Sequence, residues 1–221
     1  VPAAPFHIYP FAQSGTYVKA TTKFDTDFWP YYATDPAKSL TGANATGAWI
    51  AVNGTNSNQR FHIDLGAAVV VNRFYYENYH HLGGDTGFGV KNFTLWGSNE
   101  ATAFAELTYA TDTDWTQLTT SQATLDQHAG ADAADPKYIT VTNTTAYRYY
   151  AFKFADVWSG AYMGMRRISL QPEILPWIAE WGSVDEDLTD EMASPQVSEF
   201  SVDMIIDPDA DPDPTEARPL G

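Results

Sequence analysis

The fold is decided by the stretch Gln59–Gly66, which reads QRFHIDLG. Apolar and polar residues alternate along it, which places Phe61, Ile63 and Leu65 on one face. A period of two is typical of a β-strand with one side against a hydrophobic core. Gly66 permits the turn at which we expect the strand to end. The stretch therefore predicts a half-buried strand over residues 59–65.

Strand patterns continue on both sides of this stretch. Val69–Asn78 (VVVNRFYYEN) is rich in β-branched and aromatic residues, which strands prefer. Turn clusters separate the candidate strands, and no helical stripe is longer than about two turns. The other candidates are Tyr17–Lys23, Val90–Trp96, Glu106–Ala110, Lys137–Thr142, Tyr147–Phe154 and Met163–Leu170. We expect an all-β fold, an antiparallel β-sandwich or jelly roll, with Phe93, Trp96 and Trp115 in its core.

The order of these pieces resembles the coagulation-factor V/VIII type C family, also called the discoidin family. Its galactose-binding-like members include many bacterial and viral carbohydrate-binding modules. The resemblance covers about residues 40–171 and implies a β-sandwich whose loops at one end bind ligand. The matching stretches are Gln59–Gly66, Val71–Phe74, Val90–Glu100, Trp115–Leu118, Tyr147–Phe152 and Arg167–Leu170.

Composition excludes several classes of function. The chain has 221 residues, no cysteine and a formal net charge of −16. Without cysteine there are no disulfides, thiolate metal ligands or cysteine nucleophiles. The negative charge and the lack of a basic run argue against nucleic acid and anionic membranes as partners. No apolar run approaches the roughly 18–20 residues of a membrane span, so we expect no membrane insertion.

The acidic residues are concentrated towards the C-terminal end. Residues 172–221 hold 14 of the 28 acidic side chains and one of the 12 basic ones, which gives them a net charge of −13. The sequence therefore predicts three parts. These are an N-terminal arm with the first strands (residues 1–39), a discoidin-like sandwich (residues 40–171) and an acidic, mostly irregular C-terminal appendage (residues 172–221).

The appendage has the pattern of a connector. Ser183–Met192 is a candidate helix with Ser183 as its N-cap and acidic residues in its first turn. Val197–Ile206 reads as a strand with no obvious partner in the appendage, which favours pairing with another chain or with a sandwich edge. We therefore expect self-assembly, or contact with neighbouring structural subunits, through residues 172–221.

By resemblance, the ligand end is built from Ala51–Gln59, His80–Gly89 and Asp156–Tyr162. A sugar site needs an aromatic surface and planar polar groups for the hydroxyls. Trp158 is either the aromatic platform or a plug that caps the sandwich end, and both interpretations stay open. Adjacent residues of a strand point to opposite faces, so His80 and His81 fit ordinary loop histidines better than a metal-binding or catalytic pair. The candidate ligand-binding residues are Asn53, Asn58, Arg60, His80, His81, Phe88, Trp158 and Tyr162.

The family resemblance also implies a possible calcium site. Members with a structural calcium tend to have carboxylates in the turn before a Trp, but here that turn, Leu40–Asn44, has none. The closing strand has Arg167 where the family often has Glu. Calcium requires about six oxygen ligands, so we expect no calcium and no other cofactor.

No catalytic motif is present: there is no nucleophile elbow, phosphate loop or convincing carboxylate pair. We therefore expect a non-catalytic domain that recognises glycans or cell surfaces. It would belong to a larger extracellular or viral assembly, such as a phage tail, fibre or decoration protein, and lie outside the cell or on a virion surface. The alternative is a purely structural subunit of a virion or filament without a ligand. A module cut from a glycoside hydrolase fits less well, since no catalytic region accompanies it.

Overall fold

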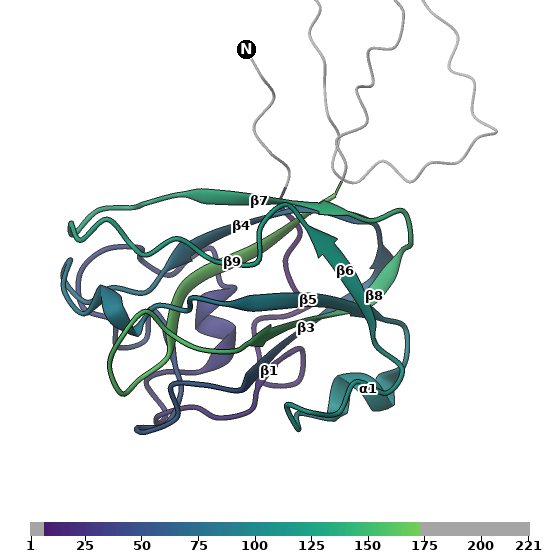
Figure 1. Ribbon diagram of the computed structural model, residues 1–221, viewed down its shortest axis with the longest axis horizontal. Coiled ribbons are helices and arrows are strands. Elements are labelled where there is room, and N and C mark those ends of the chain that lie inside the picture. Colours follow the sequence, from purple (N-terminus) through teal and green to yellow (C-terminus); the bar gives the residue numbers. More distant parts are fainter. Residues whose placement is uncertain (1–6, 173–221) are drawn as a thin grey trace, which may run out of the picture. The chain divides into compact units, whose positions relative to one another are not determined.

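The computed structural model describes residues 7–172, which form two layers of antiparallel β-strands (Figure 1). The first sheet has the order β7 (Lys137–Thr142), β4 (Val71–Asn78), β9 (Gly164–Pro172) and β2 (Trp49–Ile50). The second has the order β1 (Val18–Ala20), β3 (Gln59–Val69), β8 (Tyr147–Phe154), β5 (Phe93–Ser98) and β6 (Thr116–Thr120). The predicted all-β, discoidin-like antiparallel sandwich is confirmed.

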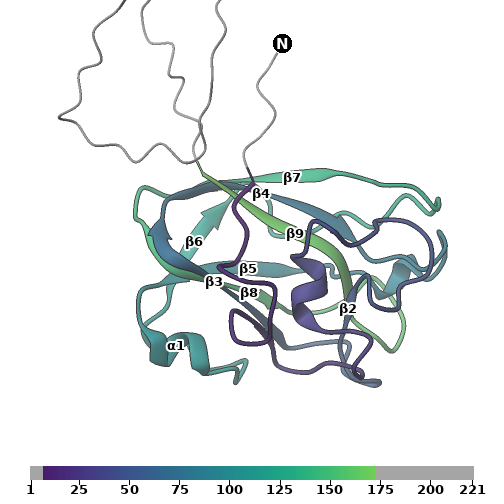
Figure 2. The same ribbon diagram turned by 180° about the vertical axis from the view of Figure 1, so that it is seen from behind.

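The two sheets are joined along one edge. Strand β6 pairs with β5 on one side and with β7 on the other, through Thr119 opposite Thr142 and Thr120 opposite Val141. Three short helices complete the described fold: η1 (Pro30–Ala33), η2 (Thr86–Phe88) and α1 (Ala101–Ala105). Figure 2 shows η1 beside β2 and β9. Within residues 7–172, no helix has the length and apolar character needed to span a membrane.

Strand β3 follows the alternation of its sequence. Phe61 and Ile63 face the other sheet and lie opposite Phe152 and Tyr150 of β8. The strand continues beyond Gly66, where we expected it to end, because the pairing with β8 shifts register between Asp64 and Val69. Gly66 has a φ of 79°, which suits this irregularity, and its N–H donates to Asp64 Oδ1 over 2.8 Å.

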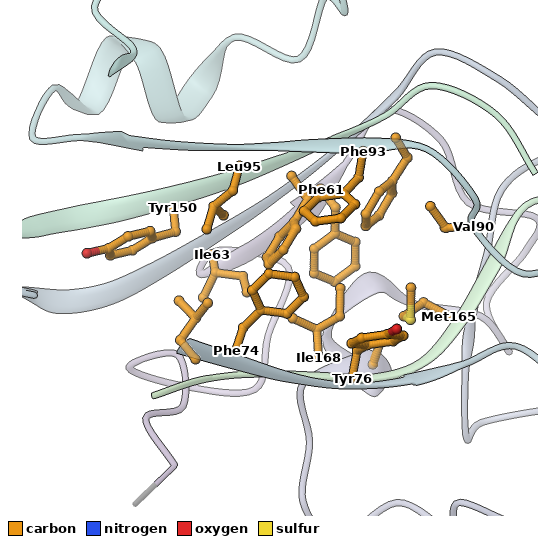
Figure 3. Close-up of a cluster of buried hydrophobic side chains, with 14 of the residues drawn as sticks. Phe61, Ile63, Phe74, Tyr76, Val90, Phe93, Leu95, Tyr150, Met165 and Ile168 are labelled. Atoms are coloured by element: carbon orange, nitrogen blue, oxygen red, sulfur yellow. The ribbon is translucent and has the colours of Figure 1, made fainter. Parts of the chain in front are cut away.

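Aromatic rings from both sheets fill the core. Phe74 of β4 meets Phe152 edge-to-face, with ring centroids 5.0 Å apart, and Phe93 of β5 at 5.5 Å. Figure 3 shows Phe93 and Leu95 pointing from β5 towards Phe74 and Ile168 of the other layer. Since each ring is removed from water between the sheets, this cluster supplies much of the hydrophobic stabilisation.

Two of the three predicted core aromatics lie elsewhere. Phe93 is in the core, but Trp115 packs with Phe104 and Tyr149 in a second cluster, and Trp96 lies half-buried against that cluster. The reason is the strand period, because Phe93 and Leu95 face inward and Trp96 must then face outward. The outer face of the second sheet, which strand alternation alone would leave exposed to solvent, is therefore covered by α1 and the loop after it.

The predicted strand Glu106–Ala110 is wrong. The chain forms α1 over residues 101–105 and then an irregular loop. Phe104 turns onto the sheet and stacks on Tyr149, with centroids 4.9 Å apart. This contact anchors residues 101–110 on β8 without strand pairing. Side-chain packing, and not local β-propensity, therefore determines the structure of this segment.

A charged cluster fastens this loop to the second sheet. Arg60 is completely buried and donates to the carbonyls of Thr108 and Thr111 and to Asp112. Lys153, also buried, donates to both carboxylate oxygens of Asp112, over 2.8 and 2.9 Å. One carboxylate is therefore the shared ion-pair partner of two buried cations, and no other ion pair in residues 7–172 involves either of them.

The predictions for the C-terminal appendage fall outside the described residues. They are the helix over residues 183–192, the strand over residues 197–206 and the role of residues 172–221 as a connector, apart from Pro172 itself, which ends β9.

Candidate ligand-binding site

A pocket of about 260 Å³ lies among loops from four separate parts of the chain. Most of its lining is aromatic, and three polar side chains reach it. We call it the aromatic pocket. The residues that line it are Phe24, Phe28, Asn44, Ile50, Tyr79, His81, Asp85, Phe88 and Tyr162.

Its rings form a connected wall. Phe24 meets Phe28 and Tyr162 edge-to-face, with centroids 5.8 Å apart in both pairs. Phe88 lies 5.2 Å from Tyr162 and 6.0 Å from Tyr79. Tyr79 is buried as part of a small apolar cluster, whereas Phe24 is 42% exposed. The wall therefore has a fixed base and a rim that a ligand can contact.

Three polar groups are set among these rings. Asn44 donates from Nδ2 to the hydroxyl of Tyr79, and burial raises the pKa of that phenol to about 12, so it stays neutral. His81 Nδ1 is buried and has no hydrogen-bond partner among residues 7–172. Asp85 is exposed and has a φ of 54° at the start of η2. The pocket thus offers an amide, an imidazole ring and a carboxylate beside aromatic faces.

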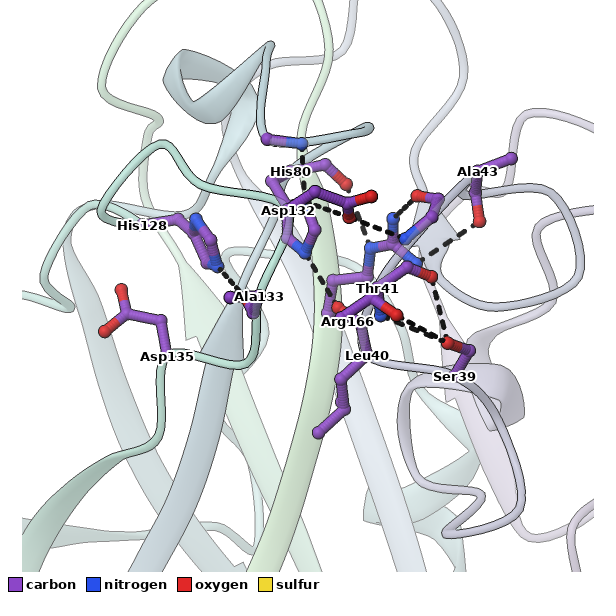
Figure 4. A network of polar contacts seen from close by, with 12 residues as sticks. Ser39, Leu40, Thr41, Ala43, His80, His128, Asp132, Ala133, Asp135 and Arg166 are labelled. Carbon is purple, nitrogen blue, oxygen red and sulfur yellow. Dashed lines mark hydrogen bonds and ion pairs between the residues drawn. The ribbon is translucent and has the colours of Figure 1, made fainter.

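A single guanidinium holds the loops behind these polar groups (Figure 4). Arg166 of β9 is completely buried and donates to the carbonyls of Gly42, Ala43 and His80. These carbonyls belong to the two loops that carry pocket residues. Gly42 and Ala43 come just before Asn44, and His80 comes just before His81. Arg166 therefore fixes the spacing between the two loops that supply these side chains.

His80 supports the site from inside. Its ring is buried, with Nε2 2.8 Å from the carbonyl of Leu40, while Nδ1 accepts from the N–H of Gly83 over 3.1 Å. It stacks on His128 with centroids 4.1 Å apart, and burial lowers the pKa of both imidazoles. Both ring nitrogens of His80 are therefore engaged in holding the loop, and His80 does not line the pocket. Its neighbour His81 does.

The structure brings together three of the eight sequence-predicted residues: His81, Phe88 and Tyr162. Asn53 and Asn58 are exposed on a neighbouring loop, which is tied to residues 155–161 by backbone hydrogen bonds. Arg60 is buried in the cluster with Asp112 and is not available to a ligand.

Trp158 also lies outside the aromatic pocket. Its Nε1 donates to the carbonyl of Leu125 over 3.2 Å, and Lys91 Nζ lies 5.1 Å from its ring centroid. Among the described residues it forms no ring pair with Phe88, which packs on Tyr79 and Tyr162 instead. The tryptophan remains 36% exposed, so it offers a face outside this pocket.

Six pocket residues escaped the sequence analysis: Phe24, Phe28, Asn44, Ile50, Tyr79 and Asp85. The run Phe24–Trp29 (FDTDFW) carries a usable signal, because two acidic residues lie between aromatic ones there, in the segment predicted as the N-terminal arm. The turn Gly83–Asp85 was another, since a carboxylate follows two glycines there.

The turn at residues 40–44, where the family resemblance would place calcium, is held by Arg166. Calcium would need oxygen ligands from the turn at residues 40–44, but two of its carbonyls, those of Gly42 and Ala43, already accept from the guanidinium. No group of three or more His, Asp or Glu side chains within residues 7–172 is arranged to hold a metal ion. A divalent cation at this turn would also be repelled by the charge of Arg166.

We therefore expect calcium to leave the protein unchanged. Millimolar calcium chloride should give the same melting temperature as the same concentration of chelator, because binding to the native state alone would raise it. The measurement is differential scanning calorimetry at constant ionic strength. A calcium-dependent rise that disappears when Asn44 is replaced by Ala would contradict the expectation.

Comparison with known proteins agrees with this architecture. The sequence profile of DUF5000, described as a domain of unknown function, matches residues 40–171. No curated protein matches the chain.

Two solved structures illustrate the structural similarity. A variant of chitosan-binding module 1 from a chitosanase/glucanase of Paenibacillus sp. IK-5 is 16% identical, with a TM-score of 0.50 over 76% of this chain and 99% of the module. A fucose-binding module of Streptococcus pneumoniae is 13% identical, with a TM-score of 0.50 over 78% of this chain and 99% of the module. At these identities the likeness shows the fold, which is the galactose-binding-like discoidin fold.

Proposed function

The chain belongs to the DUF5000 family, and we propose that its β-sandwich is a non-catalytic carbohydrate-binding module that takes a sugar in the aromatic pocket. The observation that carries the proposal is the composition of this pocket. Its rings can pack against the C–H face of a sugar, and Asn44, His81 and Asp85 can exchange hydrogen bonds with hydroxyls. Both structures compared above are named as modules that bind chitosan or fucose, which supports a saccharide ligand.

The polar groups of the pocket favour a ligand with hydroxyl groups. A hydroxyl both donates and accepts, so it can pair with the amide of Asn44 and with the exposed carboxylate of Asp85. The site is open and small, so we expect weak binding, with a millimolar dissociation constant or about 4 kcal/mol.

A binding role fits the pocket better than catalysis does. Hydrolysis of a glycosidic bond ordinarily uses two carboxyl groups on opposite sides of the bond. The residues that line the aromatic pocket include one carboxylate, Asp85, and no second one faces it. The proposed domain therefore retains a sugar and leaves it unchanged.

Replacing Phe24 by Ala tests the site. We expect sugar binding to weaken about tenfold or more, because the exposed ring is lost from the rim while the core is untouched. A glycan array identifies the ligand, and titration calorimetry compares the variants. Trp158→Ala is the matched control, since it removes an aromatic residue of similar exposure outside the pocket and should leave affinity unchanged.

Other outcomes would count against the proposal. If Trp158→Ala abolishes binding and Phe24→Ala does not, the sugar site lies at the tryptophan. A blank array, with neighbouring subunits covering the pocket, would favour the alternative of a purely structural subunit.

We further propose that the module belongs to a larger extracellular or viral assembly and is joined to it by residues 172–221. The support is the charge of −13 on this stretch, which suits contact with a basic partner surface or with other subunits. Light scattering on the full chain tests self-assembly, because a monomeric mass at all concentrations would count against it.

A further inference from the structure

A second cleft, of about 400 Å³, lies on the outer face of the first sheet. Its floor is formed by Tyr75 and Glu77 of β4 and by Arg167 of β9, which alternate with the core residues of these strands. Tyr138 of β7 lies opposite Tyr75 in register, with ring centroids 5.5 Å apart. Tyr9 also lines the cleft. We call it the sheet-face cleft, and none of its residues belongs to the aromatic pocket.

Arg167 is the unusual feature of this cleft. The residue is only 6% exposed, yet one of its three guanidinium nitrogens is paired: Nη2 donates to the carbonyl of Lys38 over 2.6 Å. Nε is buried without a partner among residues 7–172, and none of the ion pairs found there involves Arg167. A buried cation without a direct ion-pair partner is costly, so an anion that reaches the guanidinium would be stabilised in this cleft.

The nearest carboxylate does not provide this ion pair. Glu77 lies opposite Arg167 in the strand register, but its two oxygens accept from the hydroxyl of Tyr75 and the backbone N–H of Asp135, both over 2.5 Å. Burial raises the pKa of Glu77, while its hydrogen bonds with Tyr75 and Asp135 act in the opposite direction. Both oxygens of Glu77 therefore face other donors, and no ion pair within residues 7–172 joins Glu77 to Arg167.

The surroundings are also positively charged. Burial lowers the pKa of His7, and the charges of Arg73 and Arg167 lower it further. Arg73 lies beside the cleft, with its guanidinium 5.0 Å from the ring centroid of Tyr138. Arg73 and Arg167 thus place two cationic groups at this cleft, which can attract an anionic ligand, whereas Glu77 and Asp35 act on Arg167 with the opposite charge.

We propose that the sheet-face cleft binds the carboxylate of a small ligand of monosaccharide size, with Arg167 donating to the carboxylate and Tyr138 and Tyr9 packing against the rest of the molecule. The volume is within the range of small-molecule sites. Arginine is well suited to carboxylates because its planar donors match their two oxygens. This site does not depend on the proposed function of the aromatic pocket.

The test uses D-galacturonate and D-galactose, which differ in the carboxylate at one carbon. Calorimetric titrations of the full chain are carried out in the Phe24→Ala variant, in which binding in the aromatic pocket is weakened. We expect galacturonate to bind with a millimolar constant that weakens as salt is added, and galactose to bind at least about tenfold more weakly. Acetate and benzoate, titrated in parallel, show whether the carboxylate is recognised with or without a sugar ring.

Two variants locate the binding. Arg167→Gln should weaken galacturonate binding about tenfold to a hundredfold, because a charge-assisted contact is lost while a donor to Lys38 remains. Tyr138→Ala should weaken it several-fold without harm to the fold, since this residue is 46% exposed. The Tyr138 variant decides the matter if the Arg167 variant does not fold by circular dichroism.

The proposal is overturned by any of three results. The first is equal affinity for galacturonate and galactose. The second is unchanged affinity in both variants. The third is the absence of binding heat for all four probes at millimolar concentration. Failure of this site would leave the sugar-binding proposal intact, because that proposal is tested at the separate aromatic pocket by comparing Phe24→Ala and Trp158→Ala with the wild type.

Discussion

Replacing Asp112 by Asn is expected to lower the free energy of unfolding by about 3 kcal/mol. The carboxylate pairs with Arg60 and Lys153, both buried, so its loss leaves two cations close together without a counter-charge. Asp112 is itself 36% exposed, and water can reach the vacated position, which keeps the effect at the lower end of the usual range. Urea unfolding followed by tryptophan fluorescence measures the change.

Asp114→Asn is the matched control for this prediction. Asp114 lies in the same loop and is exposed, and no hydrogen bond or ion pair of its carboxylate occurs among residues 7–172. Its φ of 62° suits Asn as well as Asp, so the control should unfold like the wild type. Adding Lys153→Met to Asp112→Asn should recover part of the loss, because one unpaired cation is removed. Equal stability of the Asp112 and Asp114 variants would contradict the interpretation.

Acid should destabilise the protein through His62 well before the carboxylates protonate. Burial lowers the pKa of His62 from 6.5 to about 4, and the charges of Arg60 and Lys19 act in the same direction. Its ring is enclosed by Phe104 and Trp115, with one nitrogen 3.0 Å from the carbonyl of Phe104 and the other unpaired. A proton on the second nitrogen would place an unpaired charge in this cluster.

The direction of the pH effect follows from which state binds the proton. In the unfolded chain His62 takes up a proton near pH 6.5, whereas the folded protein resists it down to about 4. The stabilisation is therefore complete above pH 6.5 and is lost progressively as the pH falls towards 4, by about 3 kcal/mol in total.

Unfolding curves of the wild type and His62→Gln at each pH test this effect. Gln can still donate to the carbonyl of Phe104 but does not titrate, so the two stabilities should converge as the pH falls. Other groups cancel in the comparison, including His80 and His128, whose lowered pKa values act in the same direction. Glu77, whose pKa is raised, acts in the opposite direction. A constant difference between the two proteins at every pH would disprove the role of His62.

The sandwich itself could be predicted because strand periodicity is a local property. The alternation of Phe61, Ile63 and Leu65 identifies an inward face without knowledge of the partner strands, and these residues are buried. The alternation does not show what covers the opposite face. Arg60 and His62 are on that face in β3, and α1 with its loop buries both of them, which the pattern of polar residues could not indicate.

The aromatic pocket was harder to predict because its walls come from distant segments. Phe24, Tyr79 and Tyr162 lie far apart in the chain and meet because η1 and the preceding loop fold back beside β2 and β9. The family resemblance pointed to the correct loops for His81 and Phe88. It did not include the first forty residues, so the contribution of Phe24 and Phe28 could not be found that way.

The free edges of the sandwich restrict how the protein can join others. Strands β6 and β7 pair with each other, so neither is an edge strand. Among the described residues the edge strands are β1 and β2, with three and two residues. Strands this short expose too few backbone groups to recruit an added strand, and short margins are a common protection against amyloid-like stacking. Within residues 7–172, contacts with other copies are therefore expected to use side-chain surfaces, and extension of the sheet through β1 or β2 is not expected.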